Sequence, residues 1–514
     1  MAILNADIQV GWNYHNATKH SQSSVRANPH FLDWANQPLP FKIYPKLDLI
    51  PLPRELREIG VPALSTIAQV SRRDNALPDF QTLSELLYFS AGVTRRRTFP
   101  GGEIYFRAAA CTGALYEIEL YVACGPLSDL EAGLYHYAAG EFGLRRLRAG
   151  DCRRVLVEAT AGESSIAQAP VIVICTGTYW RNAWKYQART YRHFGWDNGT
   201  ILANLLAMSA ALELPAKVIC GFVDADVNRL LDVDTEREVA FSLVSIGHVA
   251  DSPPSPPGVI RSLGLETVPL SRREVDYPAM RAMHEASSLL SPEDFAAWCG
   301  NTLAVQATDA ASELVPLKPL EDAELPDDSI EQVILRRGST RRFAREPISV
   351  AQLSTILDRS TRGVAADFLN PLGAQLNDLY LVVNAVEGLL PGAYFFNRRR
   401  QGLELLKQGD FRNEAGYLGL EQELPADASV AVFFLADLAA IFQRFGNRGY
   451  RAVQLEAGII GGKLYLAAYA LHLGASGLTF YDDDVVTFFS PHAEGKNAVF
   501  LVALGKSKLK PEID

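Results

Sequence analysis

The chain has 514 residues, of which 48% are hydrophobic and 21% are charged, so it is long enough for two or more domains and too apolar for a disordered chain. Its 59 Asp and Glu residues outnumber its 49 Lys and Arg residues, which gives a formal net charge of −10. An acidic chain is a poor match for a polyphosphate backbone, so the composition argues against nucleic-acid binding.

The cysteines and the hydropathy pattern exclude further classes of protein. No two of the six cysteines form a CxxC pair and no two histidines have metal-ligand spacing, so the sequence predicts neither a disulfide framework nor a metal site. The first residues lack the basic and apolar regions of a signal peptide, and no apolar run reaches the roughly 18 residues of a membrane span. We expect a cytoplasmic protein that does not contact a membrane.

Four regions follow one another along the chain. Residues 1–60 are rich in Asn, Pro and His with little periodicity, and predict an extended arm. Residues 61–250 and 326–514 each combine short β-branched strands with one long apolar helix, and predict two α+β units. Between them, residues 251–325 begin with DSPPSPPG and predict a proline-rich connector. The predicted strands are residues 119–124, 169–177, 379–384 and 428–436, and the predicted long helices begin at Tyr191 and Tyr450.

The two units repeat one another at an offset of 259 residues. The strand APVIVICTG of the first unit corresponds to ASVAVFFLA of the second, and ALEL at 211–214 corresponds to ALHL at 470–473. A period this long, present in two copies, predicts two fused units that form an internal pseudo-dimer rather than a solenoid. The repeat leaves the further association of whole chains open.

Lys185 and Tyr186 lie beside two tryptophans in WRNAWKYQARTYRHF, directly before the first long helix. A desolvated lysine next to a tyrosine suits proton exchange with a substrate, since burial lowers the pKa of a lysine. A lysine that reaches solvent beside a packed tyrosine would have the same sequence. Cys111 has no partner histidine near it in the sequence, so we expect a buried thiol there rather than a nucleophile.

Arg337, Ser339 and Arg341 form the sharpest local motif, within ILRRGSTRRF at residues 334–343. Two guanidiniums and a hydroxyl at alternating positions suit a phosphate monoester, because charge-assisted hydrogen bonds from the arginine fork are strong. The same spacing fits a solvated helix end whose cations face the helix dipole. Both interpretations stay open on the spacing alone.

Taken together, these motifs resemble one known family over nearly the whole chain. The N-terminal arm, RAAACTGALYEIELYV and WKYQARTYRH resemble three signatures of SagB/ThcOx-type dehydrogenases, which are part of the FMN-dependent nitroreductase superfamily. In the second unit, RRGSTRRF resembles the superfamily's R-x-S-x-R phosphate grip, and GASGLTFYDDD resembles its glycine-containing strand end. The resemblance implies a tandem, fused flavoprotein of this type.

The resemblance also implies where the site lies. Family members are α+β dimers in which FMN lies at the subunit interface, with the phosphate grip from one subunit and a P-S-A-G-type loop from the other. By this resemblance the cofactor-binding residues are Arg337, Ser339, Arg341, Gly477 and Lys506 of the second unit, with Thr112, Gly113 and Ala114 of the first. Opposite the grip the first unit has Thr66, Ala68 and Val70, and opposite Lys185-Tyr186 the second has Arg444-Phe445. Each half lacks what the other keeps, so we expect one FMN per chain.

Three hypotheses of function follow from the resemblance. The first is a SagB/ThcOx-type FMN-dependent oxidoreductase that oxidises thiazoline or oxazoline rings of a modified peptide, with Lys185 and Tyr186 as catalytic proton-transfer residues. The second is an NAD(P)H-dependent nitro or quinone reductase of small molecules, with NAD(P)H as electron donor. The third is a non-catalytic flavin-binding or scaffold protein, because duplication allows sites to erode.

Overall fold

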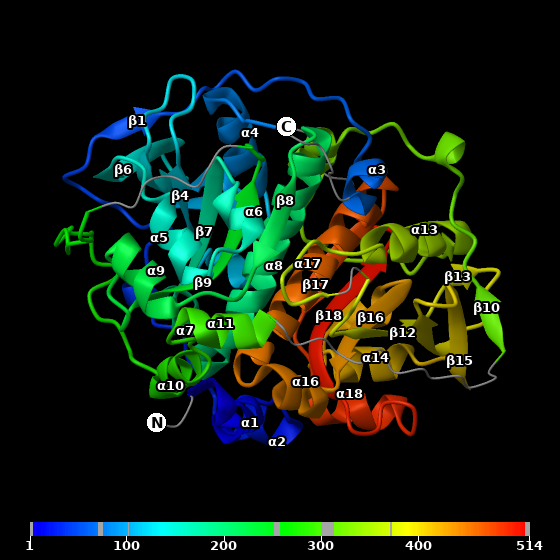
Figure 1. The fold of residues 1–514 in the computed structure, drawn as a ribbon. Helices are drawn as coiled ribbons and strands as arrows, with labels where there is room; N and C mark the ends of the chain where they lie inside the picture. Colours follow the sequence, from blue (N-terminus) through cyan, green and yellow to red (C-terminus); the bar gives the residue numbers. More distant parts are fainter. Residues whose placement is uncertain are drawn as a thin grey trace.

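Two long helices lie side by side at the centre of the molecule and separate two seven-stranded sheets (Figure 1). The helices are α8 (Thr190–Ala211) and α17 (Arg448–Ala470), and nearly all their residues are buried. This computed structural model describes residues 4–69, 76–100, 102–250, 258–299, 313–370 and 373–508. Among these, no helix has both the length and the apolar character needed to span a bilayer.

The first sheet has the strand order β1-β6-β5-β4-β7-β9-β8, with antiparallel neighbours throughout. Its strands are β1 (Leu49–Pro51), β4 (Ile118–Cys124), β5 (Gly133–Ala138), β6 (Gly143–Ala149), β7 (Val171–Thr178), β8 (Ala216–Ile219) and β9 (Glu238–Ile246). Alternate residues of β7 enter two different cores: Val171 and Val173 face the core around the central helices, and Ile172 and Ile174 face a smaller outer core. A strand buried on both faces explains the unbroken apolar run in the sequence.

The second sheet repeats this arrangement in the order β10-β15-β14-β12-β16-β18-β17. Its strands are β10 (Leu314–Pro316), β12 (Asp378–Val383), β14 (Gly392–Asn397), β15 (Gly402–Gln408), β16 (Val430–Ala436), β17 (Gly474–Leu478) and β18 (Asn497–Gly505). The helices α7 (Tyr179–Tyr186) and α16 (Leu438–Phe445) also start 259 residues apart. The prediction of two fused α+β units with a pseudo-twofold relation is therefore confirmed.

Glycines allow the two central helices to approach closely. A Cβ atom built on Gly199 would lie 2.4 Å from the carbonyl carbon of Gly458, and one built on Gly458 would lie 2.5 Å from the carbonyl oxygen of Gly195. Any larger side chain at the crossing would force the backbones apart. The repeat thus supplies matching small residues where the two units meet.

Shorter helices cover the outer faces of the sheets and the ends of the central pair. In the first unit these are α3 (Ala63–Ala68), α4 (Phe80–Ala91), α5 (Arg153–Ala159), α6 (Ser164–Ala167), η4 (Gln187–Arg189) and α9 (Asp224–Leu231). In the second they are α12 (Ile330–Arg336), α13 (Val350–Thr361), α14 (Arg412–Leu418), α15 (Glu423–Asp427) and α18 (Asp482–Phe489). The region between the units contains α10 (Pro278–Ala286), α11 (Pro292–Cys299) and η5 (Asp322–Glu324).

The N-terminal 60 residues differ from the extended arm that their composition predicts. They form η1 (Leu4–Ala6), α1 (Ile8–Ala17), α2 (Gln22–Ala27) and η2 (Trp34–Asn36), and β1 adds an edge strand to the first sheet. The helices lie against the second unit, where Gly11 N donates to Asn447 Oδ1 at 3.0 Å and His20 N donates to Asp482 Oδ2 at 2.8 Å. Tertiary contacts, rather than local periodicity, order this segment.

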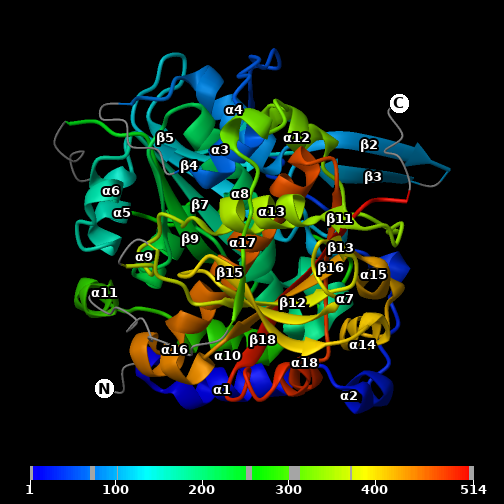
Figure 2. The ribbon, with the colours of Figure 1, turned by 90° about the vertical axis from the view of Figure 1, so that its right-hand side faces the viewer.

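Two small ladders stand apart from the main sheets. The hairpin of β2 (Val93–Phe99) and β3 (Gly102–Arg107) projects beyond the body of the molecule (Figure 2), and most of its residues are exposed. The other ladder joins β11 (Ile348–Ser349) to β13 (Val386–Glu387) in parallel. The hairpin corresponds to the extra RRRTFPGGEIYF stretch of the first unit, which the second unit lacks.

Candidate functional site

Arg337 crosses from the second unit to the first. It follows the last residue of α12, and its Nε and Nη2 donate to the carbonyl oxygens of Ala108 and Arg107, each at 2.9 Å. Its third nitrogen, Nη1, makes no hydrogen bond with any described residue. Burial lowers the pKa of the Arg337 guanidinium, although an arginine this basic stays charged. A fixed cation thus stands at the junction of the two units.

Tyr465 of α17 connects the next two residues of the predicted phosphate grip. Its hydroxyl oxygen accepts a hydrogen bond from Gly477 N and lies 3.3 Å from Ser339 Oγ. Arg341, two residues further along, is exposed and makes no hydrogen bond or ion pair with the described residues. The second unit therefore presents a hydroxyl and a second cation beside Arg337.

The loop predicted for the first unit forms a short 3-10 turn, η3 (Thr112–Ala114), held by the central helix α8. Asp197 of α8 accepts from Thr112 N at 2.9 Å and from Thr112 Oγ1 at 2.8 Å. Gly113 has a φ of +63°, and a Cβ there would lie 2.9 Å from Tyr186 Oη. Both the backbone conformation and the contact require glycine.

Lys185 and Tyr186 end helix α7 beside this loop. Lys185 is exposed, with Nζ 5.3 Å from the centre of the Tyr186 ring, and the Tyr186 ring packs edge-on against His193 at 4.6 Å. Burial and the nearby Arg341 charge lower the pKa of Lys185. Burial, followed by the carboxyl groups around the loop, raises the pKa of Tyr186. The shift at Lys185 indicates that the second unit's cation lies near the first unit's pair.

Lys506 is directed away from this group. Its Nζ lies 3.3 Å from Glu346 Oε2 in an exposed ion pair, and its carbonyl oxygen accepts from Ala344 N at 2.9 Å. The structure therefore brings Arg337, Ser339, Arg341 and Gly477 into the neighbourhood of Thr112–Ala114, Lys185 and Tyr186, whereas Lys506 anchors the segment after the grip.

The pseudo-equivalent position, at the edge strand β8, is filled by the chain itself. Val218 N donates to Ala365 O at 2.9 Å, and Val218 O accepts from Asp367 N at 3.0 Å, so residues 365–367 cover the edge of β8. Phe445, the counterpart of Tyr186, is buried and packs against Trp298 of α11 with ring centres 5.8 Å apart. Val70, Arg72 and Arg73, opposite the grip, lie outside the described residues.

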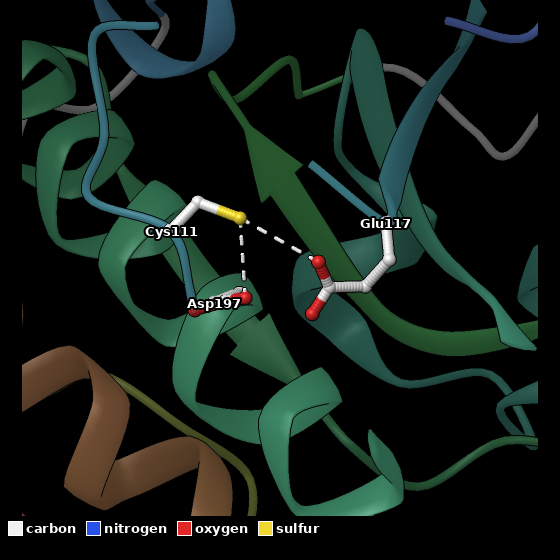
Figure 3. Close-up of side chains that lie close together, drawn as sticks. All are labelled: Cys111, Glu117 and Asp197. Carbon is white, nitrogen blue, oxygen red and sulfur yellow. Dashed lines mark hydrogen bonds between the residues drawn. The ribbon is translucent and has the colours of Figure 1, made fainter. Parts of the chain in front are cut away.

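Three ligating side chains that sequence reasoning did not connect also meet beneath the loop (Figure 3). The thiol of Cys111 donates to Asp197 Oδ2 at 3.2 Å and to Glu117 Oε2 at 3.5 Å. Burial and Asp197 raise the pKa of Cys111 and the pKa of Glu117. The three residues lie far apart in sequence with no ligand spacing, and the one available signal was acidic residues within otherwise apolar segments.

The comparisons with known proteins agree with this architecture. Residues 334–506 match the model of the nitroreductase family. A solved structure from Anabaena variabilis, provisionally named a nitroreductase, is 27% identical with a TM-score of 0.77, over 97% of this chain and 99% of that one. A protein of Methanocaldococcus jannaschii, also provisionally named a nitroreductase, is 27% identical over 177 residues, which are 32% of this chain and 87% of the relative.

Proposed function

We propose that this nitroreductase-superfamily chain is an FMN-dependent oxidoreductase of the SagB/ThcOx type, with one FMN held between its two units. The observation that carries the proposal is Arg337, which reaches from α12 of the second unit to the carbonyl groups of Arg107 and Ala108, just before the loop of the first unit. Neither unit alone contains both the cation and the loop.

The donors near Arg337 fit the phosphate group of FMN. Nη1 of Arg337, the Arg341 guanidinium and the Ser339 hydroxyl supply charged and neutral donors without an anionic partner among the described residues. A Cβ built on Gly338 would have one neighbour within 4 Å, the Tyr469 hydroxyl at 3.7 Å, so the backbone between the two arginines is open. Paired cations with a hydroxyl suit a dianion.

Bound FMN would supply two-electron transfer, and the chain's own residues would handle protons. A lowered pKa increases the neutral fraction of Lys185, which suits a base that removes a proton from a substrate carbon. A raised pKa keeps Tyr186 protonated, so its hydroxyl suits hydrogen-bond donation to the substrate. The same pair therefore carries two complementary roles.

The filled edge of β8 supports a stoichiometry of one FMN per chain. Residues 365–367 and Trp298 occupy the space around the pseudo-equivalent position, and Phe445 has no proton to transfer. The test is the flavin released from purified, FMN-saturated chain, measured by absorbance against protein concentration. We expect a value near one, with a spectrum that bleaches with dithionite and recovers in air. A value near two contradicts the single site, and a colourless chain that takes up no FMN favours a scaffold protein.

The substrate class is tested with the flavin-loaded chain. Oxidation of a thiazoline-containing peptide to the azole, coupled to reduction of the flavin, is the expected result. Rapid reduction of the flavin by NADPH, without turnover of any azoline, would instead identify a nitro or quinone reductase. Both assays use the same preparation, so loss of FMN cannot be mistaken for the wrong substrate.

A further inference from the structure

A thiol and two carboxyl groups converge below the 112–114 loop, on three different elements (Figure 3). Cys111 precedes η3, Glu117 precedes β4, and Asp197 lies in the second turn of α8. Their candidate ligand atoms all lie within 4.8 Å of one another. The pattern is independent of the residues assigned above to FMN.

The separations within this cluster fit a tetrahedral metal ion. A zinc ion with a sulfur ligand at about 2.3 Å and oxygen ligands at about 2.0–2.2 Å places sulfur and oxygen about 3.5 Å apart. Cys111 Sγ lies 3.2 Å from Asp197 Oδ2 and 3.5 Å from Glu117 Oε2. Three protein ligands at such separations leave a fourth position open.

Burial provides a second, independent observation. Glu117 is 0% exposed, its side chain is aimed into the cluster, and its Oε1 has no hydrogen-bond partner. No lysine or arginine among the described residues forms a hydrogen bond or ion pair with any of the three ligating groups. Buried carboxyl groups without a cation are costly, and a divalent ion would satisfy the orphaned oxygen.

The surrounding hydrogen bonds orient the groups as ligands. Tyr116 N donates to Cys111 Sγ at 3.0 Å, which stabilises a thiolate. Thr112 N and Thr112 Oγ1 donate to Asp197 and hold its carboxylate towards the loop. Such supporting donors fix ligand orientation around metal ions in proteins.

We propose that Cys111, Glu117 and Asp197 form a binding site for a divalent transition-metal ion. The thiolate with two carboxylates suits zinc, because soft sulfur ligands disfavour magnesium and calcium. Cys111 and Asp197 also line a small cavity together with Arg107, Tyr116 and Ile201, so the fourth position faces this cavity and takes water or a small ligand.

The test measures metal binding on the full-length, flavin-loaded chain after dialysis against a chelator. We expect retention of about one zinc per chain at micromolar free zinc, measured by mass spectrometry, and a sulfur-to-cobalt charge-transfer band in cobalt difference spectra. Cys111→Ala, Glu117→Gln and Asp197→Asn should each lower zinc retention at least tenfold. Cys299→Ala removes another half-buried thiol and should leave retention unchanged.

A second measurement on the unaltered chain covers variants that fail to fold. Zinc should slow the alkylation of Cys111 at least tenfold while leaving Cys299 unaffected, as followed by peptide mass spectrometry. Absence of stoichiometric zinc, unchanged retention in Cys111→Ala, or equal alkylation of Cys111 with and without zinc would overturn the proposal. The cluster would then be a hydrogen-bonded thiol and carboxyl group without a metal.

Discussion

Arg337 and its neighbour Arg336 offer a matched comparison within one helix end. Arg336 donates to Asp328 and to the carbonyl oxygen of Tyr469, both within the second unit, whereas Arg337 reaches the first unit. We expect Arg337→Ala to weaken FMN binding about ten- to a hundredfold, because loss of a charge-assisted contact costs about 1.5–3 kcal/mol. Arg336→Ala should leave the dissociation constant within about twofold. Fluorescence titration of the apoprotein with FMN measures both.

An equal effect of the two substitutions would contradict the grip. In that case RRGSTRRF is a solvated basic helix end, the alternative that the spacing alone leaves open. Melting temperatures of the two variants show whether any loss of FMN reflects unfolding.

Lys185 and Tyr186 are tested by turnover at constant flavin content. Lys185→Ala and Tyr186→Phe should keep FMN bound and slow the chemical step about a hundred- to ten-thousandfold, the usual contribution of general acid or base groups. Rapid-mixing measurement of flavin reduction by substrate isolates that step. A loss of tenfold or less would indicate packing rather than proton transfer.

The matched control for this pair is Arg444→Ala at the equivalent position on α16. That residue faces the side of the molecule where Trp298 packs against Phe445, so turnover should change less than twofold. A loss as large as that of Lys185→Ala would assign the working site to the opposite side of the pseudo-dimer.

Sequence reasoning at the residue scale succeeds where a motif is contiguous. Arg337, Ser339 and Arg341 lie within five residues, and their spacing is visible without a structure. Glu117 and Asp197 are separated by 80 residues and meet only because β4 packs beside α8, which no local pattern encodes. Lys506 shows the opposite error, since its assignment came from family resemblance while its side chain pairs with Glu346.

At the scale of elements, the crossing of α8 and α17 can be tested at Gly199. Alanine within a helix is normally more favourable than glycine by about 1 kcal/mol. Here Gly199→Ala should instead destabilise by about 1–3 kcal/mol, because the added Cβ would lie 2.4 Å from the backbone of Gly458. Thermal unfolding, with Gly258→Ala as the control in open space, measures the sign of the change. An increase in melting temperature for Gly199→Ala would contradict the close approach.

The long, strongly patterned elements are those that the sequence predicts well. The buried strands β4, β7, β12 and β16 and both central helices lie where their apolar runs indicate. Helix α1 is missed because its 10 residues gain order from contacts with α10 and α16 rather than from a periodic apolar face. Strands β1 and β10 have three residues each, too few to show alternation, and they exist because an edge strand pairs with them.

On the scale of the whole molecule, two reciprocal ion clusters join the units. Asp482 of the second unit accepts from Arg189 Nη1 at 3.0 Å and from Arg192 Nη1 at 2.6 Å. Asp224 of the first unit accepts from Arg448 and Arg451 of the second. All six side chains are buried. Burial alone would raise the pKa of each aspartate, but the paired arginines hold both pKa values below the usual range.

This shift predicts how stability depends on pH. The carboxylate contribution is present above about pH 4, where an aspartate of the unfolded chain is ionised, and is lost as the pH falls towards the depressed folded pKa. Asp482→Asn should cost about 3–5 kcal/mol at pH 7, because it leaves buried arginines unpaired. Its melting temperature should also decline less between pH 5 and pH 3 than that of the unaltered chain.

The exposed neighbour Asp483, paired with Lys19, supplies the control. Asp483→Asn should change the melting temperature at pH 7 by no more than about the effect of one surface ion pair, below 1 kcal/mol, and should keep the original acid profile. Parallel acid profiles for all three chains would contradict the role of the Asp482 cluster.

Covalent fusion frees the two halves from identical fates. In a homodimer every substitution appears at both symmetry-related positions, so an insertion that blocks one site blocks its twin. In this chain residues 365–367 close the edge of β8, while the hairpin of β2 and β3 extends only from the first unit. A separated pair of halves would reassemble correctly only as a heterodimer, because two copies of either half would lack the crossing from Arg337 to Arg107 and Ala108.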